Sequence, residues 1–77
     1  MEIKEIIIMF CKTLNINVQS LKYNEEKENV FIGKINTIDF CLTIIDNIYN
    51  FRLKGYKGFY QYDSKIKKIV HKQIIVN

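Results

Sequence analysis

Cysteine and histidine are scarce in this sequence: its 77 residues include two of the first and one of the second. A structural zinc site needs four such ligands, and Cys11, Cys41 and His71 supply three, without a metal-type spacing. We therefore expect neither a metal nor another cofactor. The alternating pattern around Cys41 also predicts that its side chain points away from the face of Phe40, which argues against a disulfide with Cys11.

Recognisable catalytic arrangements are missing as well. As a general base, His71 would need a nucleophile and an orienting carboxylate, but Ser20 and Ser64 lie in no nucleophile motif. The pattern places Asp39 and Asp46 at a solvent face or in a turn, where they do not form a catalytic pair. The sequence therefore predicts a protein that is not an enzyme.

Long apolar runs are absent too. The run Ile6–Cys11 is too short to cross a bilayer, and Met1–Glu5 lacks the basic segment of a signal peptide. We expect an intracellular, cytoplasmic protein with reduced thiols and no membrane partner.

Alanine, proline and tryptophan do not occur, whereas isoleucine occurs fifteen times. β-Branched side chains are stiff at χ1 and fit a pleated sheet, so this composition favours strands. An AT-rich genome would produce the same bias without structural meaning. The length allows one domain, expected to span residues 1–77, with one thin core.

An amphipathic helix is predicted over residues 2–14. Its apolar residues recur at helical spacing and form one stripe. The stripe consists of Ile3, Ile6, Ile7, Phe10, Cys11 and Leu14. Glu5 suits the positive end of the helix dipole, and Asn15 suits a left-handed stop. Ile8 and Met9 lie off the stripe, where they either flank the core or form an exposed patch that favours a homodimer.

Beyond residue 15 the apolar period changes to two, which is typical of strands. Six strands are predicted, at residues 16–23, 30–35, 38–45, 48–54, 58–63 and 67–76. The last segment also fits a helical stripe, but lysines near its start suit a helix N-terminus badly, so a strand is favoured. The predicted fold is α+β: one N-terminal amphipathic helix packed on an antiparallel, meander-like sheet of five or six strands.

Turn residues separate the strands. Turns are predicted at residues 36–37, 46–47, 55–58 and 63–65, and a bulge near Ser20. Residues 24–29 are predicted to form a polar hairpin loop. Their three carboxylates would suit a hard cation, but a solvated loop explains them more simply. Residues 55–58 lack the length and the Lys-Ser/Thr ending of a phosphate-binding P-loop.

Residues 49–62, the basic-aromatic hairpin, form the densest part of the sequence. They hold six of the ten aromatic residues and three basic residues, with no acid. Residues 1–48 carry five lysines and seven acids, whereas residues 49–77 carry seven basic residues and Asp63 alone. Such a basic end attracts phosphate or an acidic protein surface, or it is simply a solvated face.

The segment Lys57–Phe59 resembles the opening of the RNP1 strand of RNA-recognition motifs, which reads basic, glycine, aromatic. The following Tyr60–Tyr62 departs from that pattern, and a helix followed by strands departs from the element order of that family. The resemblance covers three residues and implies no membership. Its physical basis remains, since aromatic rings beside Arg and Lys stack on bases while the cations neutralise phosphates.

Alternation divides the basic-aromatic hairpin between two faces. Tyr49, Phe51 and Leu53 are expected in the core, and Phe59 with them. The open face of the sheet is predicted to carry Asp39, Cys41, Thr43, Asn50, Arg52 and Lys54. The predicted binding residues are Arg52, Lys54, Tyr56, Lys57, Tyr60 and Tyr62, with the last two expected on the face away from the helix.

The leading hypothesis is a non-catalytic protein that binds a protein or nucleoprotein partner through the open face and the basic-aromatic hairpin, since Tyr and Arg commonly anchor interfaces. By analogy, the size and composition suit a small phage- or plasmid-encoded inhibitor of a host factor, such as an anti-defence, anti-CRISPR-like protein. The alternative is a nucleic-acid-binding module that uses the same hairpin. A homodimer through edge strands, or through Ile8 and Met9, is a third hypothesis.

Overall fold

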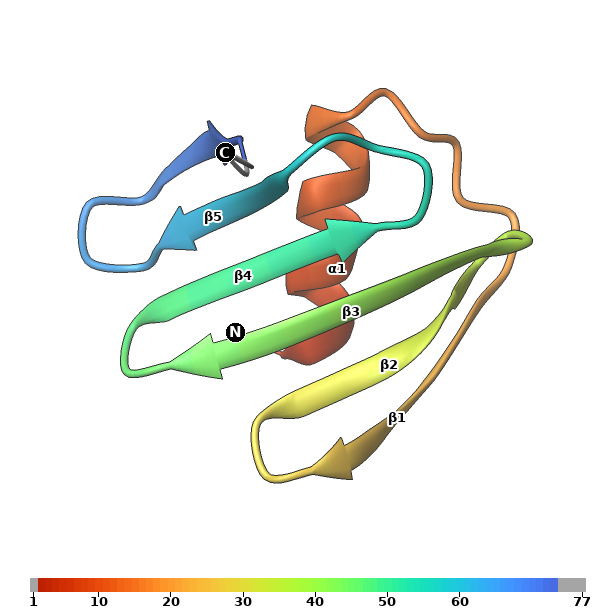
Figure 1. Cartoon of the computed structure of the whole chain (residues 1–77), viewed down its shortest axis with the longest axis horizontal. Coiled ribbons are helices and arrows are strands. Elements are labelled where there is room, and N and C mark those ends of the chain that lie inside the picture. Colours follow the sequence, from red (N-terminus) through yellow and green to blue (C-terminus); the bar gives the residue numbers. More distant parts are fainter. Residues whose placement is uncertain (1, 74–77) are drawn as a thin grey trace, which may run out of the picture.

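Residues 2–73 are described by the computed structural model. They form helix α1 (Ile3–Thr13) and strands β1 (Leu21–Lys27), β2 (Val30–Ile35), β3 (Ile38–Ile45), β4 (Ile48–Leu53), β5 (Phe59–Asp63) and β6 (Lys68–Lys72). The strands make one six-stranded antiparallel sheet in which each strand pairs with the next in sequence. The helix lies across one face of this sheet (Figure 1). The predicted α+β meander is therefore confirmed.

The apolar stripe of α1 is buried because it faces the sheet. Ile6, Ile7, Phe10 and Cys11 have no exposed surface. Asn15 follows the helix in the left-handed conformation, at φ 58°, and so acts as the predicted stop. Within residues 2–73, the helical content includes no segment with the length and hydropathy that a bilayer crossing requires.

An aromatic stack joins the helix to the sheet. The ring of Phe10 on α1 lies nearly parallel to that of Phe51 on β4, with centroids 4.8 Å apart, and Phe40 on β3 lies 5.7 Å from Phe51. The buried core around this stack comprises Ile6, Ile7, Phe10, Cys11, Ile35, Phe40, Leu42, Phe51, Leu53 and Tyr62. Because full burial of one large apolar side chain contributes about 1.5–3 kcal/mol, this core dominates the stability of the fold.

Strand β1 differs from the prediction of a strand at residues 16–23 and a loop at residues 24–29. The strand begins at Leu21 and continues to Lys27, which leaves only residues 28–29 in the turn. All its residues after the first are exposed, because β1 is an edge strand. An exposed edge tolerates charged side chains, and their charge hinders pairing with another sheet. A loop was predicted at residues 24–29 because they are polar. In the structure, the polar residues 24–27 belong to an edge strand whose charges hinder pairing with another sheet.

The bulge expected near Ser20 lies elsewhere in β1. The register with β2 shifts between Glu25 and Lys27. The carboxylate of Glu25 accepts a hydrogen bond from the amide of Asn29 at 3.0 Å, so the acidic segment closes its own turn. Across residues 2–73, no three His, Cys, Asp or Glu side chains are grouped so that they could hold a metal ion.

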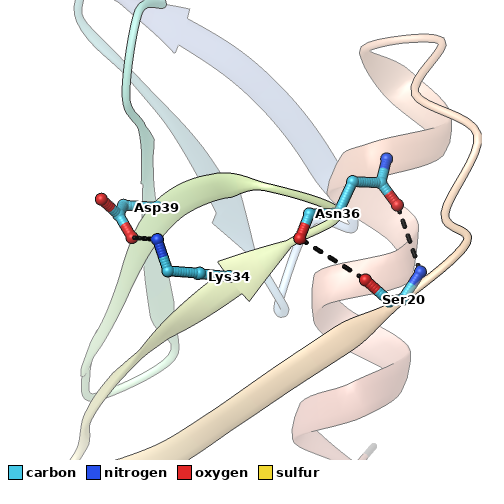
Figure 2. Close-up of polar contacts among 4 residues, drawn as sticks. All are labelled: Ser20, Lys34, Asn36 and Asp39. Carbon is cyan, nitrogen blue, oxygen red and sulfur yellow. Dashed lines mark hydrogen bonds and ion pairs between the residues drawn. The ribbon is translucent and has the colours of Figure 1, made fainter.

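Asn36, in the turn between β2 and β3, fixes the linker that joins α1 to β1 (Figure 2). Its side-chain oxygen accepts hydrogen bonds from the amides of Gln19 and Ser20, at 2.8 and 3.1 Å, and its side-chain nitrogen donates to the carbonyl of Asn17 at 3.1 Å. The hydroxyl of Ser20 donates to the carbonyl of Asn36. Asn36 also has φ 57°, which asparagine adopts more readily than most residues. The predicted turn at residues 36–37 is present.

The C-terminal segment forms a strand rather than a helix, as favoured from the sequence. Strand β6 pairs with β5 along its whole described length. The turn at residues 46–47 is present, and the turn predicted at residues 63–65 spans residues 64–67. Residues 74–76 of the predicted strand lie outside the described part of the chain.

Candidate functional site

Within residues 2–73, nothing packs on the sheet face opposite α1, which we call the open face (Figure 1). The antiparallel register aligns its side chains in rows across the strands. One row consists of Ile32, Cys41, Arg52, Phe59 and Lys72. The next consists of Val30, Thr43, Asn50, Gln61 and Val70. The β3 and β4 members, Cys41, Thr43, Asn50 and Arg52, lie on the face predicted for them.

Arg52 and Phe59 form a cation–aromatic pair on the open face, where β4 ends and β5 begins. The guanidinium carbon of Arg52 lies 5.6 Å from the centroid of the Phe59 ring, within cation–π range. Arg52 is exposed and Phe59 is half-buried. With Thr43 and Asn50 they line a shallow depression of about 280 Å³. The depression therefore presents a planar cation, an aromatic ring and two polar side chains together.

Two amide side chains lie beside this pair. The side-chain nitrogen of Gln61 donates to the side-chain oxygen of Asn50 at 2.9 Å. This bond uses one half of each amide and leaves the other half to bind a ligand. Val70 on β6 is the exposed apolar neighbour of this pair, with 44% of its surface accessible.

The loop at residues 54–58 is held against the end of β6. The Nε2 atom of His71 lies 2.7 Å from the carbonyl oxygen of Lys57 and donates to it, since a carbonyl only accepts. Gly58 has φ 69°, and a Cβ at this position would collide with the carbonyl oxygen of Lys72. Glycine is therefore required there for two reasons, backbone conformation and space.

Four of the six predicted binding residues gather at this end of the sheet. They are Arg52 on β4 and Lys54, Tyr56 and Lys57 in the loop that follows, and all four are exposed. Lys72 on β6 extends this group, because it pairs with Phe59 across the sheet. We call Arg52, Lys54, Lys57 and Lys72 the basic end.

Tyr60 and Tyr62 lie on the helix side of the sheet, and their predicted place on the opposite face is wrong. Tyr62 is 6% exposed and belongs to the core. Its ring centroid lies 6.0 Å from that of Tyr49, which packs against the core. Tyr60 is half-buried and stacks on the imidazole of His71, with centroids 4.5 Å apart. The register explains the correction, because Tyr60 pairs with Phe51 and Tyr62 pairs with Tyr49, both of which face α1.

Phe59 is the functional candidate that the sequence pattern placed in the core. Phe51 pairs with Tyr60 on the helix side of the sheet. The next residues toward the loop, Arg52 and Phe59, lie opposite each other on the open face. Loop length sets this phase, and two glycines in the loop allow several lengths. The signal that could have found this residue is that Arg52 and Phe59 flank the loop in the sequence, which allows a cation–π contact across it.

Positive charge dominates the electrostatics of the basic end. Asp39 on β3 is the acid that lies near it, paired with Lys34 at 2.9 Å (Figure 2). The hydrogen bond and charge of Lys34, followed by the charge of Lys54, lower the pKa of the Asp39 carboxyl. Because Lys34 is the hydrogen-bonded partner of Asp39 and Lys54 acts on it through charge alone, most of the positive charge of the basic end is left for an external anion.

The two cysteines occupy opposite environments. Cys11, on α1, is buried between the helix and the sheet, and this burial raises the pKa of its thiol. Cys41 is half-buried on the open face, between Ile32 and Arg52. Both thiols are free.

Comparison with models of protein families, with curated proteins and with solved structures finds no match for this chain. The function proposed below therefore rests on the side chains of the open face and the basic end.

Proposed function

We propose that this chain is a non-catalytic binding protein that engages an acidic protein surface through the open face and the basic end. The observation that carries the proposal is the uncovered row with Arg52 over Phe59 at its centre. Arginine and aromatic residues are common anchors of protein interfaces, and anchors that become fully desolvated near the centre of an interface contribute most. Apolar neighbours such as Ile32 and Val70 would exclude water around them.

The distribution of aromatic rings favours protein over nucleic acid. Binding of single strands uses several exposed rings on which successive bases stack. The open face carries Phe59, and the loop adds Tyr56, while Tyr60 and Tyr62 lie on the helix side. A guanidinium beside one ring suits a carboxylate with an adjacent apolar contact better than a run of bases.

The test uses the purified chain as immobilised bait in a bacterial lysate, with bound protein identified by mass spectrometry and bound nucleic acid quantified. We expect a stoichiometric acidic partner, with recovery about tenfold lower for Arg52→Ala and for Phe59→Ala. Lys4→Ala, an exposed change on α1, is the matched control and should leave recovery unchanged. Absence of a stoichiometric partner, or equal recovery by all variants, would contradict the proposal.

Nucleic-acid binding is the second candidate, favoured by the basic end. It requires that single-stranded DNA binds at about 50 mM salt with an affinity that falls as salt rises. It also requires that Arg52→Ala and Lys54→Ala weaken binding similarly for all sequences. If binding is absent at about 50 mM salt, the nucleic-acid hypothesis is wrong.

The biological setting extends the same proposal by analogy. A small protein that covers an acidic surface of a larger one acts as an inhibitor when that surface is needed for function. Inhibition of a host defence factor by a phage- or plasmid-encoded chain fits this picture. Identification of the captured partner decides it.

A further inference from the structure

The outer side of α1 carries a second surface, separate from the open face. Glu5, Ile8, Met9 and Lys12 line a shallow depression of about 320 Å³ on this side. Glu5 and Lys12 are exposed, whereas Ile8 and Met9 are half-buried. We call these four residues the outer helix patch. Their spacing of three, one and three residues places them on one helix face, opposite the core stripe, and Met9 at the margin of that face also packs against the core.

The outer helix patch is symmetric about the midpoint between Ile8 and Met9. Glu5 and Lys12 lie equally far from that midpoint, in opposite directions. At a rise of about 1.5 Å per residue they are about 10 Å apart along the axis, too far to pair with each other. The described residues contain one ion pair, Lys34 with Asp39, so neither Glu5 nor Lys12 has an ionic partner within them.

We propose that the outer helix patch binds a second copy of this chain, with the two α1 helices antiparallel about a two-fold axis. Such an axis requires a surface that is complementary to itself. It would place Glu5 of each copy beside Lys12 of the other, with Ile8 and Met9 in contact at the centre. A parallel arrangement would instead place Glu5 beside Glu5, which is unfavourable.

The size of the outer helix patch limits the strength of this dimer. One pair of short helices buries less than about 1,200 Å², which is typical of weak, transient association. The dimer should therefore form in a concentration-dependent way. Because the outer side of α1 points away from the sheet, both open faces would remain accessible in the dimer (Figure 1).

Charge reversal tests the pairing directly by sedimentation velocity at concentrations from micromolar to millimolar. Glu5→Lys makes the ionic groups of the patch wholly positive, and Lys12→Glu makes them wholly negative. Each variant alone should self-associate about ten- to thirtyfold more weakly than the unchanged chain, since two attractions become repulsions. An equimolar mixture of the two variants should form a heterodimer about as tight as the original dimer, because it again contains two attractive pairs.

Further variants separate pairing across the two helices from a general effect of net charge or of unfolding. The double variant with Glu5→Lys and Lys12→Glu should regain self-association, because the antiparallel pairs are restored with reversed sign. Lys27→Glu, an equal charge reversal on the exposed edge strand β1, should change nothing. Circular dichroism of each variant confirms that α1 is folded, since reversed charges at helix ends are mildly unfavourable.

Three results would overturn the proposal. The first is a chain that stays monomeric up to about 1 mM, a concentration at which even millimolar affinities are visible. The second is self-association insensitive to both single reversals but lost in Lys27→Glu, which would indicate edge-strand pairing. The third is a mixture of the two folded reversed variants that fails to associate. None of these results bears on capture of an acidic protein by the open face.

Discussion

Cys11 and Cys41 are the same chemical group in two surroundings, which makes them internal reporters of the two sheet faces. We expect iodoacetamide to alkylate Cys41 in the folded protein and to spare Cys11. Burial shields Cys11 and raises the pKa of its thiol, so less of the reactive thiolate forms. Mass spectrometry of the labelled protein measures both rates, and in urea they should become similar. Equal labelling in the folded state would contradict the assignment of faces.

Asp39 should titrate below the usual range of an aspartate in the folded protein, because Lys34 and Lys54 lower its pKa. A carboxyl whose pKa is lower in the folded state adds stability above its unfolded pKa and loses it as pH falls through its folded pKa. Carbon-detected NMR titration of the side chain measures this shift. Lys34→Met should raise the Asp39 pKa more than Lys54→Met, since Lys34 is the hydrogen-bonded partner.

Asn36 combines a left-handed backbone with three side-chain hydrogen bonds to the linker. We expect Asn36→Ala to lower the free energy of unfolding by about 1–3 kcal/mol, because both contributions are lost. Asn36→Gly keeps the backbone freedom and should cost less. Urea unfolding monitored by circular dichroism compares the two, and equal losses would show that the left-handed backbone contributes little and that the hydrogen bonds account for the effect.

Among the elements, the β4–β5 hairpin offers a matched pair of glycines. Gly55 and Gly58 both have positive φ, but only at Gly58 would a Cβ meet another part of the chain, the carbonyl oxygen of Lys72. Gly55→Ala should therefore cost about 1–2 kcal/mol from backbone strain alone. Gly58→Ala should cost more than about 3 kcal/mol and loosen β6, because steric overlap adds to the strain. Thermal unfolding and amide exchange of β6 residues distinguish the two, and similar losses would contradict this account.

Helices and strands with one buried face were predictable from the sequence. The bounds of the edge strand and the side-chain orientation of β5 were not. The apolar stripe of α1 and the apolar alternation of β3 predicted the buried face correctly, because one face of each element packs on the core. Strand β1 has almost no buried side chain, so nothing in its sequence alternates. Which face each β5 side chain occupies depends on the length of the loop at residues 54–58. An error of one residue in this length assigned Phe59 to the core and Tyr60 to the open face, the reverse of their actual places. Arg52 was identified as a binding candidate because β4 has a clear period.

At the scale of the whole molecule, the two sheet faces differ in burial because α1 covers one of them, and one pair of substitutions tests this difference. Phe51→Ala removes a ring from the core and should cost about 3–5 kcal/mol, a large part of the total stability of a small domain. Phe59→Ala removes the same ring from the open face and should cost clearly less, about 1 kcal/mol, since that ring is only half-buried. Urea unfolding measures both, and a comparable loss for Phe59→Ala would assign that ring to the core.

The meander also has a consequence for synthesis. The 11-residue helix α1 is too short to be stable alone, since isolated helices need roughly 12–15 residues. Its aromatic partner Phe51 lies on the fourth strand, and at about 5–20 residues per second the ribosome adds it roughly 2–8 s after Thr13. Until β4 has been added, the apolar stripe of α1 lacks the ring on which Phe10 stacks in the finished protein. Helix α1 therefore reaches its full packing only after the fourth strand has been added, although it precedes β1 to β4 in the sequence.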